Sequence, residues 1–214
     1  MAANEPAAPG AASLKRLRLA LVIAVALLAA AVVALVVFRP QNDQSSAAVT
    51  GTPSAIWAAG EKQAPDFRLT DEHGNPVTIS GLRGRRVIVT FLDPHCTTFC
   101  PRESLVLNDA LRTFPPAERP AVVAVSVDPK TRSFTVLQKE ARRFKWLPQW
   151  RWAVGSAPQL NPVWGAYHIQ VVPAAHDIGH TEAAYLVDAN GDQRALFLWP
   201  FKAADIASAL KQIS

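Results

Sequence analysis

The stretch Thr90-Phe-Leu-Asp-Pro-His-Cys-Thr-Thr-Phe-Cys-Pro101 contains both cysteines of the 214-residue chain, Cys96 and Cys100. The apolar run 86–92 before them is typical of a strand, and a helical pattern follows Pro101. Proline suits the first helical position, because the N–H that it lacks would have no partner there. We therefore predict that the helix begins at Pro101, with Cys100 at its N-cap or just before it. There the helix dipole favours the thiolate, the form that attacks disulfides and binds metals.

Patterns on either side of this stretch predict an α/β domain. The run 121–127 is continuously apolar and β-branched, as in a strand covered on both faces. The segments 183–187 and 194–199 are joined by a turn that contains Asn190-Gly191, a strong hairpin signal. A further hairpin is predicted over 67–79, and helices over 103–114, 131–144, 157–167 and 203–213. This order predicts a thioredoxin-like mixed sheet flanked by helices, with the thiols at the end of the first central strand.

An uninterrupted apolar run, residues 19–38, follows the basic segment 15–18. A membrane-spanning helix needs about 20 apolar residues, whereas the apolar part of a cleaved signal peptide has about 7–15. We therefore predict one uncleaved transmembrane helix at 19–38, and the positive charges before it place the N-terminus in the cytoplasm. Residues 1–18 are predicted to be disordered, 39–63 to be a linker, and 64–214 to be a folded domain on the extracytoplasmic side.

The composition argues against nucleic-acid binding. The net charge of +5 is modest, and the sequence has no run of Lys and Arg interleaved with aromatic residues. A structural disulfide is also disfavoured, because a bridge between Cys96 and Cys100 would close a very short loop and stabilise the domain little. These exclusions leave thiol chemistry or metal binding as the use of the two cysteines.

The metal that best fits two thiolates and one imidazole is copper, as Cu(I), or as Cu(II) with further ligands. His180 is the candidate imidazole, because it precedes a predicted central strand that passes beside the thiol turn. Zinc is the alternative, but a structural zinc site needs four protein ligands and would require a second histidine such as His95 or His176. His95 either fills the loop or acts electrostatically on the neighbouring Cys96, and the sequence leaves both interpretations open.

The segment from about residue 64 to 214 resembles the Sco/SenC family of membrane-anchored copper chaperones and thiol–disulfide reductases that serve cytochrome c oxidase. The resemblance implies that Cys96, Cys100 and His180 hold one copper ion per domain. It also implies as partners the copper subunit of the oxidase, other copper chaperones or thiol reductants, and the membrane. Many family members have Pro-Asp at the positions of Thr97-Thr98, and Asp where this chain has Gly179. The motifs that carry the resemblance are Ala64-Pro-Asp-Phe67, His95-Cys-Thr-Thr-Phe-Cys-Pro101, Val125-Ser-Val-Asp-Pro129 and His180-Thr-Glu-Ala-Ala-Tyr-Leu-Val-Asp188.

Two functions remain in competition. In the first, Cys96, Cys100 and His180 carry copper to the dinuclear copper (CuA) site of the oxidase. In the second, the cysteines cycle through a disulfide and reduce the thiols of that site or of a partner chaperone. Cys96 is expected to be the attacking thiol because it lies in the loop, whereas the position near the helix end favours Cys100, and the sequence does not settle this. A peroxidase is less well supported, because Pro94-His95-Cys96 does not supply the expected Thr-x-x-Cys arrangement with an assisting arginine.

Overall fold

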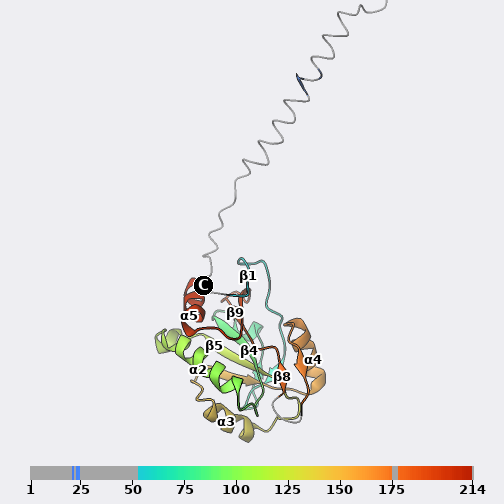
Figure 1. The fold of residues 1–214 in the computed structure, drawn as a ribbon, viewed down its shortest axis with the longest axis vertical. Helices are drawn as coiled ribbons and strands as arrows, with labels where there is room; N and C mark the ends of the chain where they lie inside the picture. The colour runs from blue at the N-terminus through green and yellow to red at the C-terminus, as the bar shows by residue number, and fades with distance from the viewer. Residues whose placement is uncertain (1–20, 22, 25–52, 175–177, 214) are drawn as a thin grey trace, which may run out of the picture. The chain divides into compact units, whose positions relative to one another are not determined.

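The computed structural model describes residues 53–174 and 178–213, together with residues 21, 23 and 24, which are helical. The chain divides into two compact units, Met1–Gln44 and Ser45–Ser214. The second unit contains a six-stranded sheet with helices on both faces (Figure 1). The predicted thioredoxin-like α/β fold is therefore confirmed.

The sheet has the strand order β1-β10-β9-β4-β5-β6. Strands β4, β5 and β6 are parallel, whereas β9 runs antiparallel to β4 and to β10, and β1 pairs with β10 at the edge. The bounds are β1 (Ala55–Ile56), β4 (Val87–Leu92), β5 (Ala121–Ser126), β6 (Trp150–Ala153), β9 (Ala183–Val187) and β10 (Gln193–Leu198). Two small antiparallel pairs are β2 (Leu69–Thr70) with β3 (Pro76–Val77), and β7 (Val171–Val172) with β8 (Gly179–His180). The helices are α2 (Phe99–Arg112), α3 (Phe134–Arg143), α4 (Ala157–Ala166) and α5 (Ala203–Gln212), with 3₁₀ turns η1 (Ser80–Leu82) and η2 (Pro116–Glu118).

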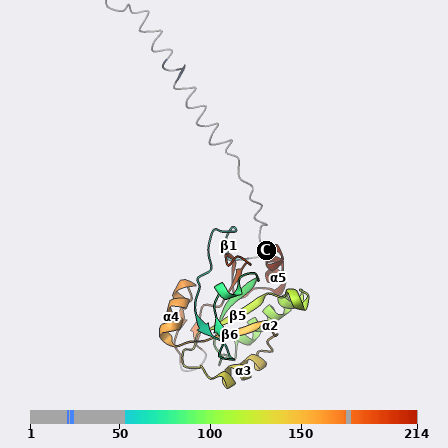
Figure 2. The ribbon, with the colours of Figure 1, turned by 180° about the vertical axis from the view of Figure 1, so that it is seen from behind.

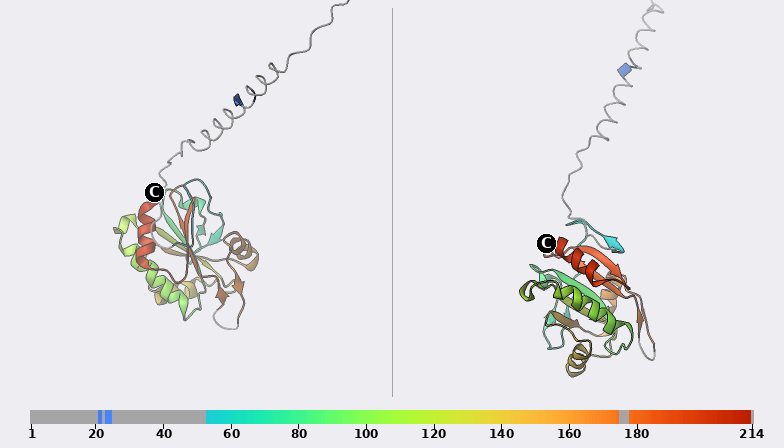
Figure 3. Two further views of the ribbon diagram at one scale, coloured as in Figure 1. Left: turned by 45° about the horizontal axis from the view of Figure 1, so that its top comes forward. Right: turned by 60° about the vertical axis from the view of Figure 1, so that its left-hand side comes forward.

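Alternate residues of β4 enter two different hydrophobic cores, as the period of two along a strand requires. Ile88 and Leu92 pack in the core shared with α2, α3 and α5, whereas Val89 and Phe91 pack in the core shared with α4. Helices α2 and α5 lie on one side of the sheet and α4 on the other (Figures 2 and 3). Thr90 is fully buried between Val89 and Phe91, so a hydroxyl group enters the core beside α2. The cysteine loop therefore begins at the end of a strand that is packed on both faces.

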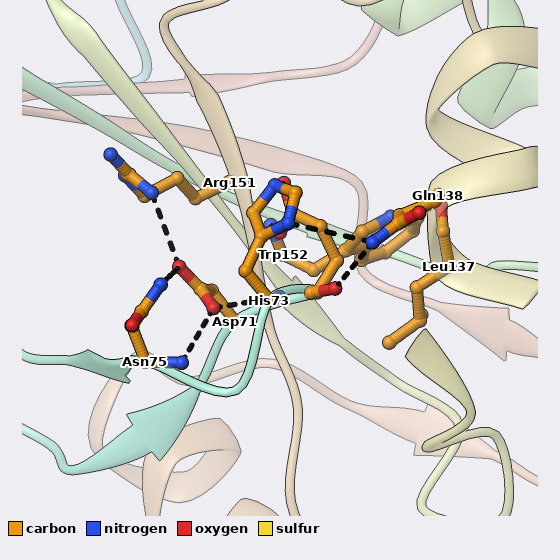
Figure 4. A network of polar contacts seen from close by, with 8 residues as sticks. Asp71, His73, Asn75, Leu137, Gln138, Arg151 and Trp152 are labelled. Carbon is orange, nitrogen blue, oxygen red and sulfur yellow. Dashed lines mark hydrogen bonds and ion pairs between the residues drawn. The ribbon is translucent and has the colours of Figure 1, made fainter. Parts of the chain in front are cut away.

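The predicted hairpin over 67–79 is confirmed as β2 and β3, and polar contacts attach its turn to the domain (Figure 4). Asp71 accepts the backbone N–H groups of His73 and Asn75, each at 2.8 Å, and forms an ion pair with Arg151 of β6 at 3.1 Å. The Glu72 carboxylate accepts the backbone N–H of Trp152 at 2.8 Å. Strand β6 is thus joined to the hairpin as well as to β5.

The predicted start of the cysteine-bearing helix is wrong by two residues. Helix α2 begins at Phe99 with Thr98 as its N-cap, so Cys100 and Pro101 both lie within the first turn. Proline fits this position because the first N–H groups of a helix have no intrahelical partner. Cys100 is therefore a helical residue, and Cys96 lies in the loop.

The N-terminal predictions fall largely outside the described residues. The predicted disordered segment 1–18 and nearly all of the predicted transmembrane helix 19–38 belong to this part of the chain. Within the described residues, no helix has the length and apolar character needed to cross a bilayer. The last residues of the predicted linker 39–63 are described, and they contact the sheet through β1.

Candidate metal and thiol site

The two cysteines form a single hydrogen-bonded unit at the end of β4. The backbone N–H of Cys100 donates to Cys96 Sγ at 3.3 Å, and the Thr98 hydroxyl lies 3.7 Å from the same sulfur. Both side chains are free thiols, with relative exposures of 5% for Cys96 and 1% for Cys100. The first turn of α2 therefore directs its hydrogen-bond donors at the loop cysteine.

The two thiols have opposite acidities. The pKa of Cys96 is lowered to about 5, chiefly by the hydrogen bond from the Cys100 thiol and also by the Cys100 and Thr98 N–H groups, against the opposing effect of burial. The same hydrogen bond, together with burial and the negative charge on Cys96, raises the pKa of Cys100. Both shifts favour ionisation at Cys96 and a retained proton on Cys100, so Cys96 is the better candidate for the attacking sulfur.

His180 reaches the cysteine pair from β8, 80 positions later in the chain. Its Nε2 lies 3.9 Å from Cys100 Sγ, and its Nδ1 lies 3.1 Å from the carbonyl oxygen of Thr181. A carbonyl can only accept, so Nδ1 carries a proton, and in the neutral ring the Nε2 lone pair lies on the side of Cys100 Sγ. Burial lowers the pKa of His180, which favours the neutral ring. The imidazole is thus oriented as a metal ligand would be.

Asp93 joins the two halves of the site, and the sequence analysis did not single it out. One carboxylate oxygen accepts the backbone N–H of His95 at 2.8 Å, and the other accepts that of Ile178 at 2.9 Å. His95 lies in the cysteine loop, and Ile178 lies two residues before His180. The carboxylate of Asp93, which is 2% exposed, therefore fixes the cysteine loop relative to the segment that carries His180.

The cysteine loop is also held from α3. The Arg143 guanidinium forms an ion pair with Glu140 and donates to the carbonyl oxygens of Pro94 at 3.1 Å and Cys96 at 2.9 Å. The Arg143 side chain therefore attaches the backbone of the cysteine loop to α3.

His95, for which the sequence left two interpretations, contacts Thr131. The distance from His95 Nε2 to Thr131 Oγ1 is 2.8 Å, and the Thr131 hydroxyl donates to Asp128 at 2.6 Å. Since the hydroxyl has one hydrogen, the His95 Nε2–H must be the donor to Thr131. The ring thereby ties the cysteine loop to the loop that follows β5.

A second buried carboxyl group, Glu103, lies beneath the cysteines in the core. The Thr90 hydroxyl is hydrogen-bonded to Glu103 Oε1 and lies 3.0 Å from the carbonyl oxygen of Ala183, while Glu103 Oε2 has no partner. Thr90 has one hydrogen for two oxygens, and the Ala183 carbonyl cannot donate, so a protonated Glu103 completes the arrangement. Burial likewise raises the pKa of Glu103 to about 8. Both observations favour the neutral acid for Glu103 at pH 7, and its place three residues after Cys100 in the helix is the only sequence signal for it.

Comparison with known proteins places the chain in a family. The family model described as SCO1/SenC matches residues 58–214. The chain belongs to the SCO1/SenC family. The resemblance inferred from the motifs is therefore confirmed.

Among solved structures, the Sco domain, residues 58–214, is similar to Bradyrhizobium japonicum ScoI with copper bound, at 23% identity and a TM-score of 0.62, over 72% of this chain and 99% of that chain. It is also similar to BsSco, described as a member of the Sco family of cytochrome c oxidase assembly proteins with a disulfide switch. For BsSco the identity is 21% and the TM-score 0.61, over 71% of this chain and 92% of that chain. At these identities the likeness shows a shared fold.

The sequence relatives carry a different name. Two Mycobacterium tuberculosis proteins, from strains CDC 1551 and H37Rv, are provisionally named as peroxiredoxins. Each is 31% identical to the Sco domain over 142 residues, which cover 65% of this chain and 84% of the relative.

One sulfur and one nitrogen of the site lie close enough to bind the same metal ion. Bonds of about 2.0 Å to nitrogen and about 2.3 Å to sulfur, the lengths found at zinc, together span about 4.3 Å. The 3.9 Å between Cys100 Sγ and His180 Nε2 falls within that span. Across residues 53–174 and 178–213, no group of three or more His, Cys, Asp or Glu side chains is already arranged to hold a metal ion. The structure thus shows two close pairs that share Cys100, namely Cys96 with Cys100 and Cys100 with His180. His176, a possible further ligand in the zinc alternative, lies outside the described residues.

Proposed function

We propose that this chain is a membrane-anchored copper chaperone that delivers copper to the dinuclear CuA site of cytochrome c oxidase during its assembly. Cys96, Cys100 and His180 bind one copper ion as cargo. The observation that carries this proposal is the approach of His180 Nε2 to Cys100 Sγ, across 80 residues of sequence, with its lone pair directed at the sulfur.

The protonation states suit capture of Cu(I). The Cys96 thiolate is the first ligand, since its pKa is already lowered. Cys100 then loses its proton as it joins the ion, so binding releases about one proton at neutral pH. The neutral His180 ring supplies its nitrogen without losing a proton, and two thiolates with one imidazole form a donor set that Cu(I) accepts. Transfer to the acceptor proceeds by exchange of these ligands for the thiolates of the acceptor.

The relatives support the same cargo and acceptor. A structural neighbour that shares the fold is described with copper bound, and another is described as belonging to a family of cytochrome c oxidase assembly proteins. The apolar run 19–38 anchors the chain with its N-terminus in the cytoplasm, so residues 64–214 act on the extracytoplasmic side. Its partners there are the copper subunit of the oxidase and other copper chaperones or thiol reductants.

Metal analysis of the reduced full chain, purified in detergent, tests the proposal. We expect one copper per chain in the presence of a competing chelator, and none in the Cys96→Ser/Cys100→Ser variant. His73→Ala is the matched control, because His73 lies in the turn of the N-terminal hairpin. A wild-type chain that retains no copper would exclude the chaperone function.

The unequal acidity of the two cysteines favours thiol–disulfide exchange as a second function. The Cys96 thiolate attacks one sulfur of a partner disulfide, forms a mixed disulfide, and displaces the other partner sulfur as a thiolate. Cys100 then loses its proton to solvent and attacks Cys96 Sγ, which releases the second partner thiolate. The partner gains two electrons, and the chain is left with a Cys96–Cys100 disulfide. The two functions exclude each other at any moment, because the oxidised pair cannot bind copper.

Trapping experiments test this second function. With the oxidised copper domain of the oxidase as substrate, Cys100→Ser should accumulate a mixed disulfide through Cys96, whereas Cys96→Ser should accumulate none. Equal trapping by the two variants would contradict the assignment of Cys96 as the attacking sulfur. Hydrogen peroxide consumption, measured in parallel, tests the name carried by the mycobacterial relatives.

A further inference from the structure

A pocket of about 990 Å³ adjoins the cysteine loop. Its walls come from the cysteine loop, the loop after β5, helix α4 and the β7–β8 pair. Figures 1 and 3 show α4 and β8 on the same side of the domain. Binding pockets typically have about 300–1,000 Å³ and mostly apolar walls. This pocket is therefore large enough for several side chains of a bound segment.

The pocket is continuous with the candidate site. Asp93, His95 and Thr97 of the cysteine loop line it, and so does Ile178, two residues before His180. The sulfurs themselves are almost fully buried, at 5% exposure for Cys96 and 1% for Cys100. An acceptor thiol therefore has little exposed sulfur surface to approach, and the two residues that flank Cys96 in the chain, His95 and Thr97, line the pocket.

The chemistry of the walls indicates what the pocket binds. Trp164, Ile169 and Val171 contribute apolar surface, and the Trp164 indole N–H already donates to the carbonyl oxygen of Ser126 at 3.1 Å, so its ring face remains for contact. The Asp128 carboxylate accepts hydrogen bonds from the Lys130 N–H and the Thr131 hydroxyl. In the described part of the chain, no carboxylate forms an ion pair with the exposed Lys130 ammonium. An apolar segment with a carboxylate at the Lys130 end complements these walls.

Gly165 supplies a second, independent indication of an occupant. It lies in α4 and lines the pocket, yet a Cβ atom added there would meet no heavy atom within 4 Å. Glycine within a helix costs roughly 0.5–1 kcal/mol relative to alanine. The packing of the described residues does not account for this cost. A segment that approaches the α4 backbone closely from the pocket would account for it.

We propose that this pocket binds an extended, mainly apolar segment of the acceptor protein, next to the cysteines that receive copper, with an acidic residue of that segment paired with Lys130. The inference rests on the proposed function, since it identifies how the acceptor of that same site is held. It adds a docking surface that is separate from the metal ligands.

A matched pair of variants on α4 tests the proposal. Gly165→Phe adds a ring at a residue that lines the pocket and has open space around its Cβ position, whereas Ala166→Phe adds the same ring at an exposed residue that does not line the pocket. The full chain in detergent is assayed with two oxidised substrates, the soluble copper domain of the oxidase subunit and the small disulfide DTNB. We expect Gly165→Phe to lower kcat/KM for the protein substrate by at least about tenfold, as loss of a central contact does. Reaction with DTNB and copper retention should be unchanged, and Ala166→Phe should match the wild type with both substrates.

A charge reversal provides the second arm. Lys130→Glu should weaken binding of the copper domain, and the difference from wild type should shrink as salt is added, because screening weakens charge pairing. Equal rates for Gly165→Phe and Ala166→Phe with the copper domain, in a chain that still retains copper, would overturn the docking surface alone. A wild-type chain that neither retains copper nor reacts with the copper domain would overturn both proposals. Loss of self-association in Gly165→Phe, with unchanged reaction with the copper domain, would assign the pocket to a second copy of the chain instead.

Discussion

The carboxylate of Asp93 accepts the backbone N–H of Ile178 at 2.9 Å and so connects the cysteine loop to the strand that carries His180. Its other oxygen accepts the N–H of His95. An asparagine in this position has one oxygen for two donors, and its NH₂ group would face an N–H.

Asp93→Asn should therefore loosen His180 relative to the cysteines. We expect copper affinity to fall by about 10–100-fold, the usual effect of losing a group that orients metal ligands. Chelator competition with the reduced chain measures this. Asp66→Asn is the control, because Asp66 also accepts several backbone N–H groups but lies in the N-terminal hairpin region. Equal losses of affinity in both variants would mean that general destabilisation is the cause.

The second prediction concerns His180. His180→Ala should weaken copper binding by more than about tenfold while changing the rate of disulfide exchange less than threefold, since the imidazole supplies a lone pair to the metal and the thiolate resides on Cys96. Parallel measurement of copper retention and DTNB reduction separates the two effects. Equal effects on both would show that His180 is not a ligand.

The third prediction concerns the acidity of Cys96. Alkylation by iodoacetamide should show an inflection near pH 5 in the wild-type chain. Cys100→Ala removes the thiol that donates to Cys96, so the inflection should move up toward the ordinary thiol value of about 8.5. An unchanged inflection would mean that the backbone N–H groups alone hold the thiolate. Cys96→Ala should leave a thiol that reacts only at high pH.

The fourth prediction concerns the pH dependence of folding stability. The pKa of Glu103 rises from 4.5 to about 8 on folding, so the folded chain binds more protons than the unfolded chain between these values. The contribution of Glu103 to stability is therefore complete below pH 4.5 and falls by about 1.4 kcal/mol per pH unit as the pH rises toward 8. Glu103→Gln remains neutral throughout, so its stability relative to the wild type should increase over the same interval.

Urea unfolding at pH 5, 6, 7 and 8 measures this difference. The measured quantity is the difference in unfolding free energy between Glu103→Gln and the wild type. This difference is needed because the lowered pKa of Cys96 makes the stability of both chains increase with pH over part of the same range. Glu182→Gln is the comparison, since the pKa of Glu182 is also raised by burial but its side chain is partly exposed, and its effect should be smaller. A flat difference for Glu103→Gln would show that Glu103 is ionised in the folded chain.

The fifth prediction concerns membrane topology. An alkaline phosphatase fusion after residue 45 should be active, because the basic residues before the apolar run 19–38 hold the N-terminus in the cytoplasm. A fusion after residue 12 should be inactive. An inactive fusion after residue 45 would contradict an extracytoplasmic domain.

Much of the fold could be predicted because the apolar runs in the sequence coincide with the strands that are buried in the structure. The runs 86–92, 121–127 and 183–187 are apolar because each lies inside a sheet covered on both faces, and the Asn190-Gly191 turn has the residues that its hairpin needs. His180 could be proposed because the segment before a central strand must pass beside its neighbour. The tautomer of His180 and its distance from Cys100 depend on contacts formed only in the folded chain.

Other features depend on contacts that no local pattern encodes. Strand β6 was not predicted, because its residues Trp150–Ala153 form no β-branched run and are held by pairing with β5 and by Glu72. The start of α2 was misjudged because proline is accepted anywhere in a first turn. The importance of Asp93 and Glu103 follows from partners that lie 85 and 13 positions away, Ile178 and Thr90.

The register of β9 against β4 has a consequence for the order of events during biosynthesis. Thr90 pairs with Ala184, so the histidine segment, which directly precedes β9, is held beside the sulfurs only once β9 has paired with β4. A nascent polypeptide that ends before this segment has both thiols but lacks His180 and the Ile178 N–H that Asp93 accepts. Under the proposed function, loading with metal therefore follows the pairing of β9 with β4.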